Sequence, residues 1–183
     1  MSRLSVVDPA TAEPAAKVLL DKVDRALGVV PNMMRAMAAS PAVLDAYLSF
    51  SGALAKGQLS AAVREQIALV AASENACGYC YAAHHVLGAR AGVSSDDLAA
   101  GGRAEASDPR VEAALRFARA VLREKGFVSD DELAAVREAG YSDGEIGEII
   151  GAVALNVFTN YFNSTGETEI DFPVVDLPAR VTV

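Results

Sequence analysis

Residues 77–85 read Cys-Gly-Tyr-Cys-Tyr-Ala-Ala-His-His, and this stretch contains every cysteine and every histidine of the 183-residue chain. If it forms a helix, each residue turns by about 100°, so Cys77, Cys80 and His84 share one stripe. His85 then lies at the edge of that stripe. Residues four apart are neighbours on a helix, so the imidazole of His84 can reach the sulfur of Cys80. We therefore expect the reactive chemistry of the chain in this stretch.

Paired thiols at the start of a helix favour redox chemistry. Asn75 and Gly78 predict a break that places the Cys-x-x-Cys pair at a helix N-terminus. The thiolate is the nucleophilic form of cysteine, and both a helix N-terminus and an adjacent imidazole stabilise it. A second thiol three residues away can attack an oxidised first sulfur and form a disulfide. The pattern indicates that one cysteine reacts and the other resolves.

A carboxylate twelve residues before Cys77 can extend this pair into a proton relay. Glu65 is a charged residue in an otherwise apolar helical run. If the break near Asn75 folds that helix back on the next one, Glu65 can hydrogen-bond His84. Carboxylate, imidazole and thiol would then stand in series, which is the general logic of an activated nucleophile.

Other interpretations of the same residues stay open. The cysteines and histidines could bind zinc within one chain or between subunits, although one helix does not readily place four ligands tetrahedrally. They could equally be buried structural residues, and Glu65 alone could be a solvated surface carboxylate. Tyr79 and Tyr81 flank Cys80 and could donate a hydroxyl to the site.

Helical periodicity continues on both sides of this stretch, with Pro, Ser or Asp at the starts and Gly at many of the ends. We expect an all-α fold of about eight to nine helices and find no convincing strand alternation. Residues 167–183 should form an extended tail, laid over the body or over a neighbouring subunit. The expected helices are 14–27, a short one through Met37, 41–56, 61–74, 78–91, a short one between Ser94 and Gly101, 109–125, 130–139 and 143–163.

Length and composition exclude several classes of protein. A chain of 183 residues is one domain, or at most two small ones. With 16 Lys plus Arg against 24 Asp plus Glu, the net charge is −8, so nucleic acid and anionic membranes are poor partners. No window approaches about 18 uninterrupted apolar residues, and Met1–Ser5 does not begin a secretory signal. We expect a cytoplasmic protein with reduced thiols.

The spaced motif resembles a known family. Glu65, eleven intervening residues, Cys77-x-x-Cys80 and then His84 resemble the signature of the alkylhydroperoxidase D-like proteins of the carboxymuconolactone decarboxylase superfamily. A less specific similarity to a peroxidase-related branch of this superfamily covers about residues 14–175. The resemblance implies one all-α domain over residues 1–183, with its motif helices at about 60–92. It also implies homo-oligomers such as trimers or hexamers, with neither a metal nor an organic cofactor.

The resemblance also implies roles for the motif residues. Cys80 would be the peroxidatic thiol, activated by His84, and Cys77 the resolving thiol attacked by a thioredoxin- or lipoyl-type dithiol donor. The implied activity is thiol-dependent hydroperoxide or disulfide reduction. Tyr79 stands where the best-known members carry a second histidine, and the side chain of His85 should point elsewhere. A carboxymuconolactone decarboxylase-like lyase and a redox-sensing oligomer without turnover are the alternatives.

Overall fold

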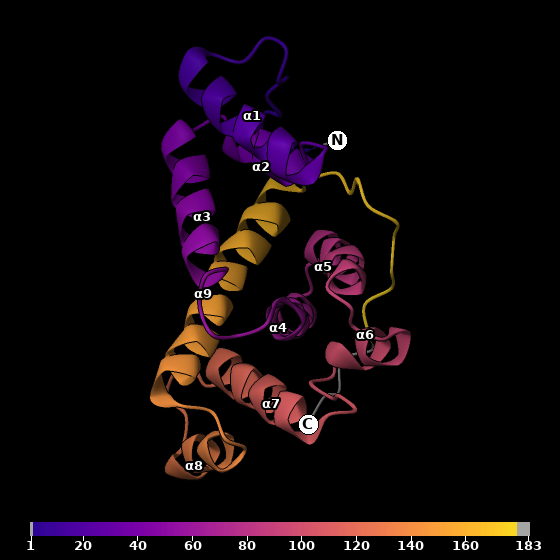
Figure 1. Ribbon diagram of the computed structural model, residues 1–183. Coiled ribbons are helices and arrows are strands. Elements are labelled where there is room, and N and C mark those ends of the chain that lie inside the picture. The colour runs from indigo at the N-terminus through magenta and orange to yellow at the C-terminus, as the bar shows by residue number, and fades with distance from the viewer. Residues whose placement is uncertain (1, 179–183) are drawn as a thin grey trace.

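The computed structural model describes residues 2–178, and within them it contains nine α-helices and no β-strand, which confirms the all-α expectation. No helix in this part of the chain is long and apolar enough to cross a bilayer. Figure 1 shows the helices in their arrangement. They are α1 (Pro14–Leu27), α2 (Asn32–Met37), α3 (Pro41–Leu54), α4 (Ala61–Glu74), α5 (Gly78–Arg90), α6 (Ser95–Gly101), α7 (Pro109–Arg123), α8 (Asp130–Glu138) and α9 (Asp143–Gly166).

Proline and serine set most of the helix starts, as the sequence predicts. Pro14, Pro41 and Pro109 lie in the first turns of α1, α3 and α7, where a backbone N–H would have no partner within the helix. The serines before α4, α6, α8 and α9 each accept a hydrogen bond from the backbone N–H three residues later. Those before α8 and α9 belong to complete capping boxes.

Three helix ends differ by two or three residues from the expected ones, and those of α5 and α8 differ by one. Helix α3 ends at Leu54 and α7 at Arg123, each two residues early, within the usual uncertainty of helix ends. Helix α9 instead continues to Gly166, beyond the predicted end at residue 163. Glu167 takes a left-handed φ of 44°, and the N–H of Thr168 donates to the carbonyl of Asn163 at 3.1 Å. The helix continues through polar residues here, and one of them, Asn163, is buried against the body of the protein.

Helix α4 lies at the centre of the molecule and packs against α5, α7 and α9, which surround it in Figure 1. Residues 66–72 of α4 are all buried, which is typical of a helix enclosed on every side. One hydrophobic cluster joins α4, α7, α8 and α9. A second cluster joins α1, α2, α3 and the start of α5, and it contains both cysteines.

The turn between α4 and α5 fixes how these two helices meet. Ala76 adopts a left-handed φ of 53°, although it is not a glycine. The N–H of Cys77 donates to the carbonyl of Ala72 at 2.8 Å, which closes the end of α4. The chain then reverses, and α5 returns along α4. This reversal brings the middle of α4 beside the middle of α5.

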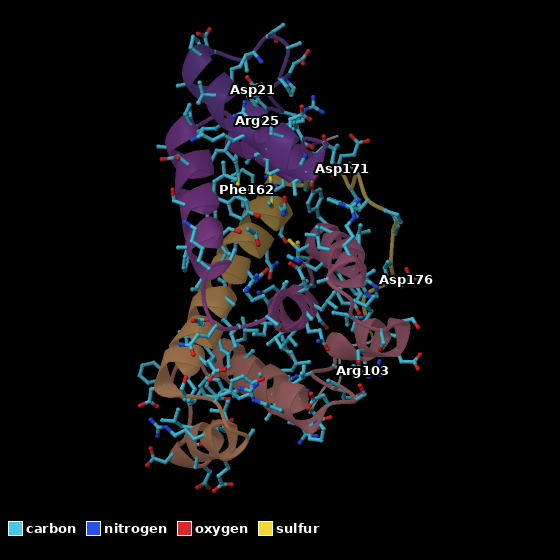
Figure 2. All side chains as sticks on the ribbon, in the orientation of Figure 1. Asp21, Arg25, Arg103, Phe162, Asp171 and Asp176 are labelled. Atoms are coloured by element: carbon cyan, nitrogen blue, oxygen red, sulfur yellow. The ribbon has the colours of Figure 1, made fainter. Side chains whose placement is uncertain are left out.

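The C-terminal tail, residues 167–178, has no regular secondary structure and runs from the end of α9 past α5 to α6 (Figure 1). The side chain of Asp171, labelled in Figure 2, accepts a hydrogen bond from the N–H of Asn32 at 2.8 Å. Phe172 packs edge-on against the ring of Tyr79, with 5.7 Å between centroids. Up to residue 178 the tail therefore covers the chain's own body; the expectation for 179–183 lies outside the described residues.

Candidate functional site

The two cysteines meet at the first turn of α5. Cys77 is the N-cap residue, and its sulfur accepts a hydrogen bond from the N–H of Cys80 at 3.3 Å. The two sulfurs lie 2.6 Å apart, with the thiol of Cys77 donating to the sulfur of Cys80. Both residues are free cysteines and are only 3% and 2% exposed. Their sulfurs are close enough for a disulfide to form with little movement of the backbone.

The two thiols differ in acidity. The pKa of Cys80 lies below its ordinary value because the Cys77 thiol donates to its sulfur, an effect that outweighs burial, and because the charge of His84 favours the anion. The pKa of Cys77 is raised because its proton is held by Cys80 and because the group is buried. Deprotonation is therefore favoured at Cys80 over Cys77, although Cys77 occupies the N-cap position.

Glu65 and His84 form the ion pair that the sequence predicts. Oε2 of Glu65 lies 2.7 Å from Nδ1 of His84, and the two side chains are 23% and 20% exposed. Burial opposes a charge on the imidazole, but the carboxylate of Glu65 outweighs burial and raises the pKa of His84 above its ordinary value. The imidazole of His84, one helical turn from Cys80, is thus held in place by a carboxylate on the neighbouring helix.

Helix α9 supplies amides to this site that the sequence reasoning missed. Nδ2 of Asn163 donates to the sulfur of Cys80 at 3.2 Å. Asn160 and Asn156 lie one and two turns earlier, and both are buried. The signal for these residues was present: three asparagines at positions i, i+4 and i+7 occupy one face of a mostly apolar helix. Only the packing of α9 against α5 shows what that face touches.

Tyr47 of α3 is a second residue that the sequence reasoning missed. Its pKa is raised to about 12 by burial and by the negative charges of Glu65 and Cys80. The hydroxyl therefore stays protonated near the two groups that carry negative charge. Tyr47 thus adds α3 to the helices whose polar groups lie near Glu65 and Cys80.

The flanking aromatic and imidazole groups serve other contacts. The hydroxyl of Tyr79 accepts a hydrogen bond from the N–H of Met33 at 3.1 Å, which ties α5 to α2. The ring of Tyr81 packs on that of His85, with 4.8 Å between centroids, and Nε2 of His85 is buried without a partner. Neither Tyr79 nor His85 contacts a cysteine sulfur by a hydrogen bond within the described chain.

Among residues 2–178, no group of three or more His, Cys, Asp or Glu side chains is arranged to hold a metal ion.

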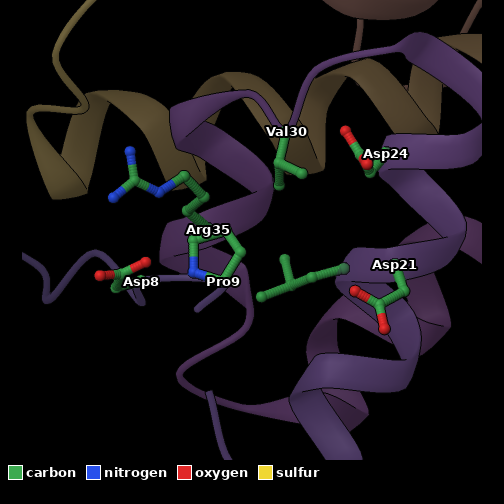
Figure 3. Close-up of a pocket in the computed structure, with 7 residues that line it drawn as sticks. Asp8, Pro9, Asp21, Asp24, Val30 and Arg35 are labelled. Carbon is green, nitrogen blue, oxygen red and sulfur yellow. The ribbon is translucent and has the colours of Figure 1, made fainter. Parts of the chain in front are cut away.

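A cavity lies away from the thiol site. It has a volume of about 420 Å³, lies between the N-terminal segment, α1 and α2 (Figure 3), and its lining contains none of the predicted site residues. The lining residues are Asp8, Pro9, Leu20, Asp21, Asp24, Val30 and Arg35.

Comparisons with known proteins agree with the fold and with the family that the sequence resembles. Residues 41–124 match the model of the carboxymuconolactone decarboxylase family. Among solved structures, a peroxidase-related protein from Ralstonia eutropha JMP134 with an alkylhydroperoxidase D core is 25% identical, with a TM-score of 0.83 over 93% of this chain and 92% of that one. A peroxidase-related protein from Silicibacter sp. TM1040 is also 25% identical, with a TM-score of 0.74 over 90% and 91%.

A more distant neighbour shares the fold. The debrominase Bmp8, solved in complex with 2,3,4-tribromopyrrole, is 19% identical, with a TM-score of 0.79 over 92% of this chain and 91% of that one. No curated protein sequence matches this chain. The family match over residues 41–124 contains the whole Glu-Cys-Cys-His motif, and the fold extends the likeness to most of the chain. Residues 41–124 therefore match the carboxymuconolactone decarboxylase family, and the fold of most of the chain is similar to that of alkylhydroperoxidase D-like, peroxidase-related proteins.

Proposed function

We propose that the chain is a thiol-dependent peroxidase in which Cys80 reduces a hydroperoxide and Cys77 resolves the product. The observation that carries the proposal is the 2.6 Å separation of the two sulfurs beside the Glu65–His84 pair. The lowered pKa of Cys80 favours its thiolate near neutral pH, and the raised pKa of Cys77 keeps that thiol protonated. The pair therefore combines a nucleophilic thiolate at Cys80 with a protonated resolving thiol at Cys77.

The reaction balances in three steps. The thiolate of Cys80 attacks one peroxide oxygen, the O–O bond breaks, and the imidazolium of His84 protonates the departing alkoxide, which leaves as alcohol. Cys80 is then a sulfenic acid, which the sulfur of Cys77 attacks to form the disulfide and release water. An external dithiol of the thioredoxin or lipoyl type returns two electrons by disulfide exchange at Cys77. Neither a metal nor an organic cofactor takes part in these steps.

Thiol counting tests this proposal. The chain has two cysteines, so one equivalent of hydroperoxide should remove both thiols from the wild-type protein. Cys77→Ser should lose one thiol and accumulate a sulfenic acid that dimedone traps, whereas Cys80→Ser should keep its thiol. Wild-type thiols that survive stoichiometric hydrogen peroxide and an organic hydroperoxide would refute the proposal.

The alternatives make different predictions. A carboxymuconolactone decarboxylase-like lyase would not need the cysteines, so a double Cys→Ser variant would still turn over the lactone. A redox-sensing oligomer would oxidise and change its association without consuming further peroxide when a dithiol donor is present. The close approach of the two sulfurs favours the peroxidase over the lyase, because a lyase has no use for a disulfide.

We also propose that the protein self-associates, as its family resemblance implies. Ile150, Ala154, Phe158 and Tyr161 of α9 form an exposed apolar stripe, beside which Phe50 of α3 is also exposed. Apolar stripes of this kind are typical of protein interfaces, and a second copy is the occupant that we expect. Replacing Phe158 by Glu should lower the mass measured by light scattering. A wild-type protein that is monomeric at assay concentration would refute this second proposal.

A further inference from the structure

Two amide groups of α9 converge on the sulfur of Cys80. Nδ2 of Asn163 donates to that sulfur at 3.2 Å, and Asn163 is almost completely buried. Asn160 lies one turn earlier on the same face and is 0% exposed. Its Oδ1 accepts from Nδ2 of Asn75 at 2.9 Å, which fixes the orientation of the Asn160 amide.

The fixed orientation leaves one donor of Asn160 without a partner. Its Nδ2 is buried and has no hydrogen-bond partner among the described residues. Leaving a buried donor unpaired is costly, and such groups in native structures call for an explanation. A donor pre-set beside a sulfur is satisfied when that sulfur carries negative charge, since a thiolate accepts several hydrogen bonds while a thiol accepts few. The unpaired Nδ2 thus points to an anion at this place.

We propose that Asn160 and Asn163 form a two-donor amide pocket that stabilises the Cys80 thiolate, with Asn75 as the positioning residue that orients it. The proposal deepens the proposed function by adding catalytic residues on a third helix, and it rests on Cys80 being the reactive thiol. Hydrogen bonds from both amides also lower the pKa of Cys80, in addition to the effects of Cys77 and His84. Fixed donors of this kind cost no reorganisation when the charge forms.

The two amides are distinguished from the other groups that act on Cys80 by being uncharged at every pH. A change in the titration of Cys80 after their removal therefore reports a lost donor rather than an altered charge nearby. The titratable groups that face this sulfur or the pair behind it are Cys77, Tyr79 and His84 of the α5 region, Glu65 of α4 and Tyr47 of α3.

The test is the pH dependence of Cys80 alkylation by iodoacetamide, followed by mass spectrometry of the modified peptide. Asn160→Leu and Asn163→Leu keep the side-chain size and remove the donors. We expect each to move the midpoint of the profile to higher pH. At a pH below both midpoints, a midpoint that is higher by one pH unit slows alkylation about tenfold, because the thiolate fraction falls by that factor. Asn163→Asp keeps the shape and polarity, and its carboxylate should raise the midpoint further.

Thr159→Val is the matched control. Thr159 is also buried in α9, but its hydroxyl donates to the carbonyl of Asn156 in its own helix. This variant loses a buried hydrogen bond without losing a donor to Cys80, so its midpoint should equal that of the wild type. Folded Asn160→Leu, Asn163→Leu and Asn163→Asp variants whose midpoints also equal that of the wild type would overturn the amide pocket.

The assay separates this inference from the proposed function. Alkylation needs only a thiolate, whereas peroxide consumption needs the complete cycle. If the asparagine variants have raised midpoints but the wild type does not react with hydroperoxides, the amide pocket is supported and the peroxidase proposal is refuted. Unchanged midpoints in a protein whose wild type consumes hydroperoxides would refute the amide pocket alone.

Discussion

Oε2 of Glu65 lies 2.7 Å from Nδ1 of His84, so a single hydrogen-bonded ion pair joins the middle of α4 to α5 beside the thiols. Replacing Glu65 by Gln keeps the shape but removes the negative charge that raises the pKa of His84. The imidazole then loses its proton at lower pH and can no longer protonate a leaving group near neutral pH. We expect peroxide turnover to fall about a hundredfold, measured with a saturating dithiol donor.

The same pair predicts how stability depends on pH. Because the pKa of His84 is raised on folding, its contribution to the free energy of unfolding is complete below the unfolded value of about 6.5 and is lost as the pH rises through the folded value. Urea unfolding of the wild type and of Glu65→Gln should therefore differ most near pH 5.5 and less at alkaline pH. A difference that grows as the pH rises would contradict this assignment.

The hydrogen bond between the two thiols predicts that each cysteine changes the acidity of the other. In Cys77→Ala, Cys80 loses the donor that most lowers its pKa, so that pKa should rise. In Cys80→Ala, Cys77 loses the partner that raises its pKa, so that pKa should fall. The ultraviolet absorbance of the thiolate, followed through a pH titration of each variant, measures both changes. Two profiles that move in the same direction would contradict the arrangement.

Tyr79 should contribute to stability and not to thiol chemistry. Its hydroxyl accepts the hydrogen bond of the buried Met33 N–H, so Tyr79→Phe leaves that donor unpaired. We expect the free energy of unfolding to fall by about 1–3 kcal/mol in urea titrations. The alkylation profile of Cys80 should keep its wild-type midpoint. A displaced midpoint with unchanged stability would show instead that the hydroxyl acts on the thiols.

The left-handed backbone at Ala76 predicts a sharp dependence on residue type. Valine is β-branched and disfavours this conformation more than alanine does, so Ala76→Val should lower the free energy of unfolding by about 1–2 kcal/mol. Glycine adopts it without strain, and Ala76→Gly should stay within about 1 kcal/mol of the wild type. Ala91→Val, at the end of α5 with an ordinary φ of −80°, is the control and should change stability little.

The sequence was sufficient for the helices because their ends are marked by local chemistry. Pro41, Ser60 and Ser142 predict starts that depend on only a few neighbouring residues. The pairing of Glu65 with His84 was also predictable, because one break between two helices brings a known spacing together. These features need no information from distant parts of the chain.

The remaining features of the site depend on tertiary packing. Asn160 and Asn163 are more than 75 residues from Cys80 in sequence, and only the rotation of α9 about its axis decides that they face the sulfur. The family resemblance implied that Cys80 is the more reactive thiol, but the hydrogen bond that lowers its pKa was equally hidden. A helix N-terminus favours a thiolate at Cys77, yet the thiol of Cys77 donates to Cys80 and reverses that preference. Local sequence does not record the direction of that bond.

The tail has a consequence for the speed of any catalytic cycle. Ile170 lies opposite Gly78, and Phe172 packs on Tyr79, so residues 167–178 cover the start of α5 where Cys77 is buried. A small oxidant needs little space, but a protein donor must place its own sulfur in line with the bond between Cys77 and Cys80. If a protein donor regenerates the thiols as we propose, the tail must first leave this surface, and the frequency of that movement would limit regeneration however concentrated the donor is.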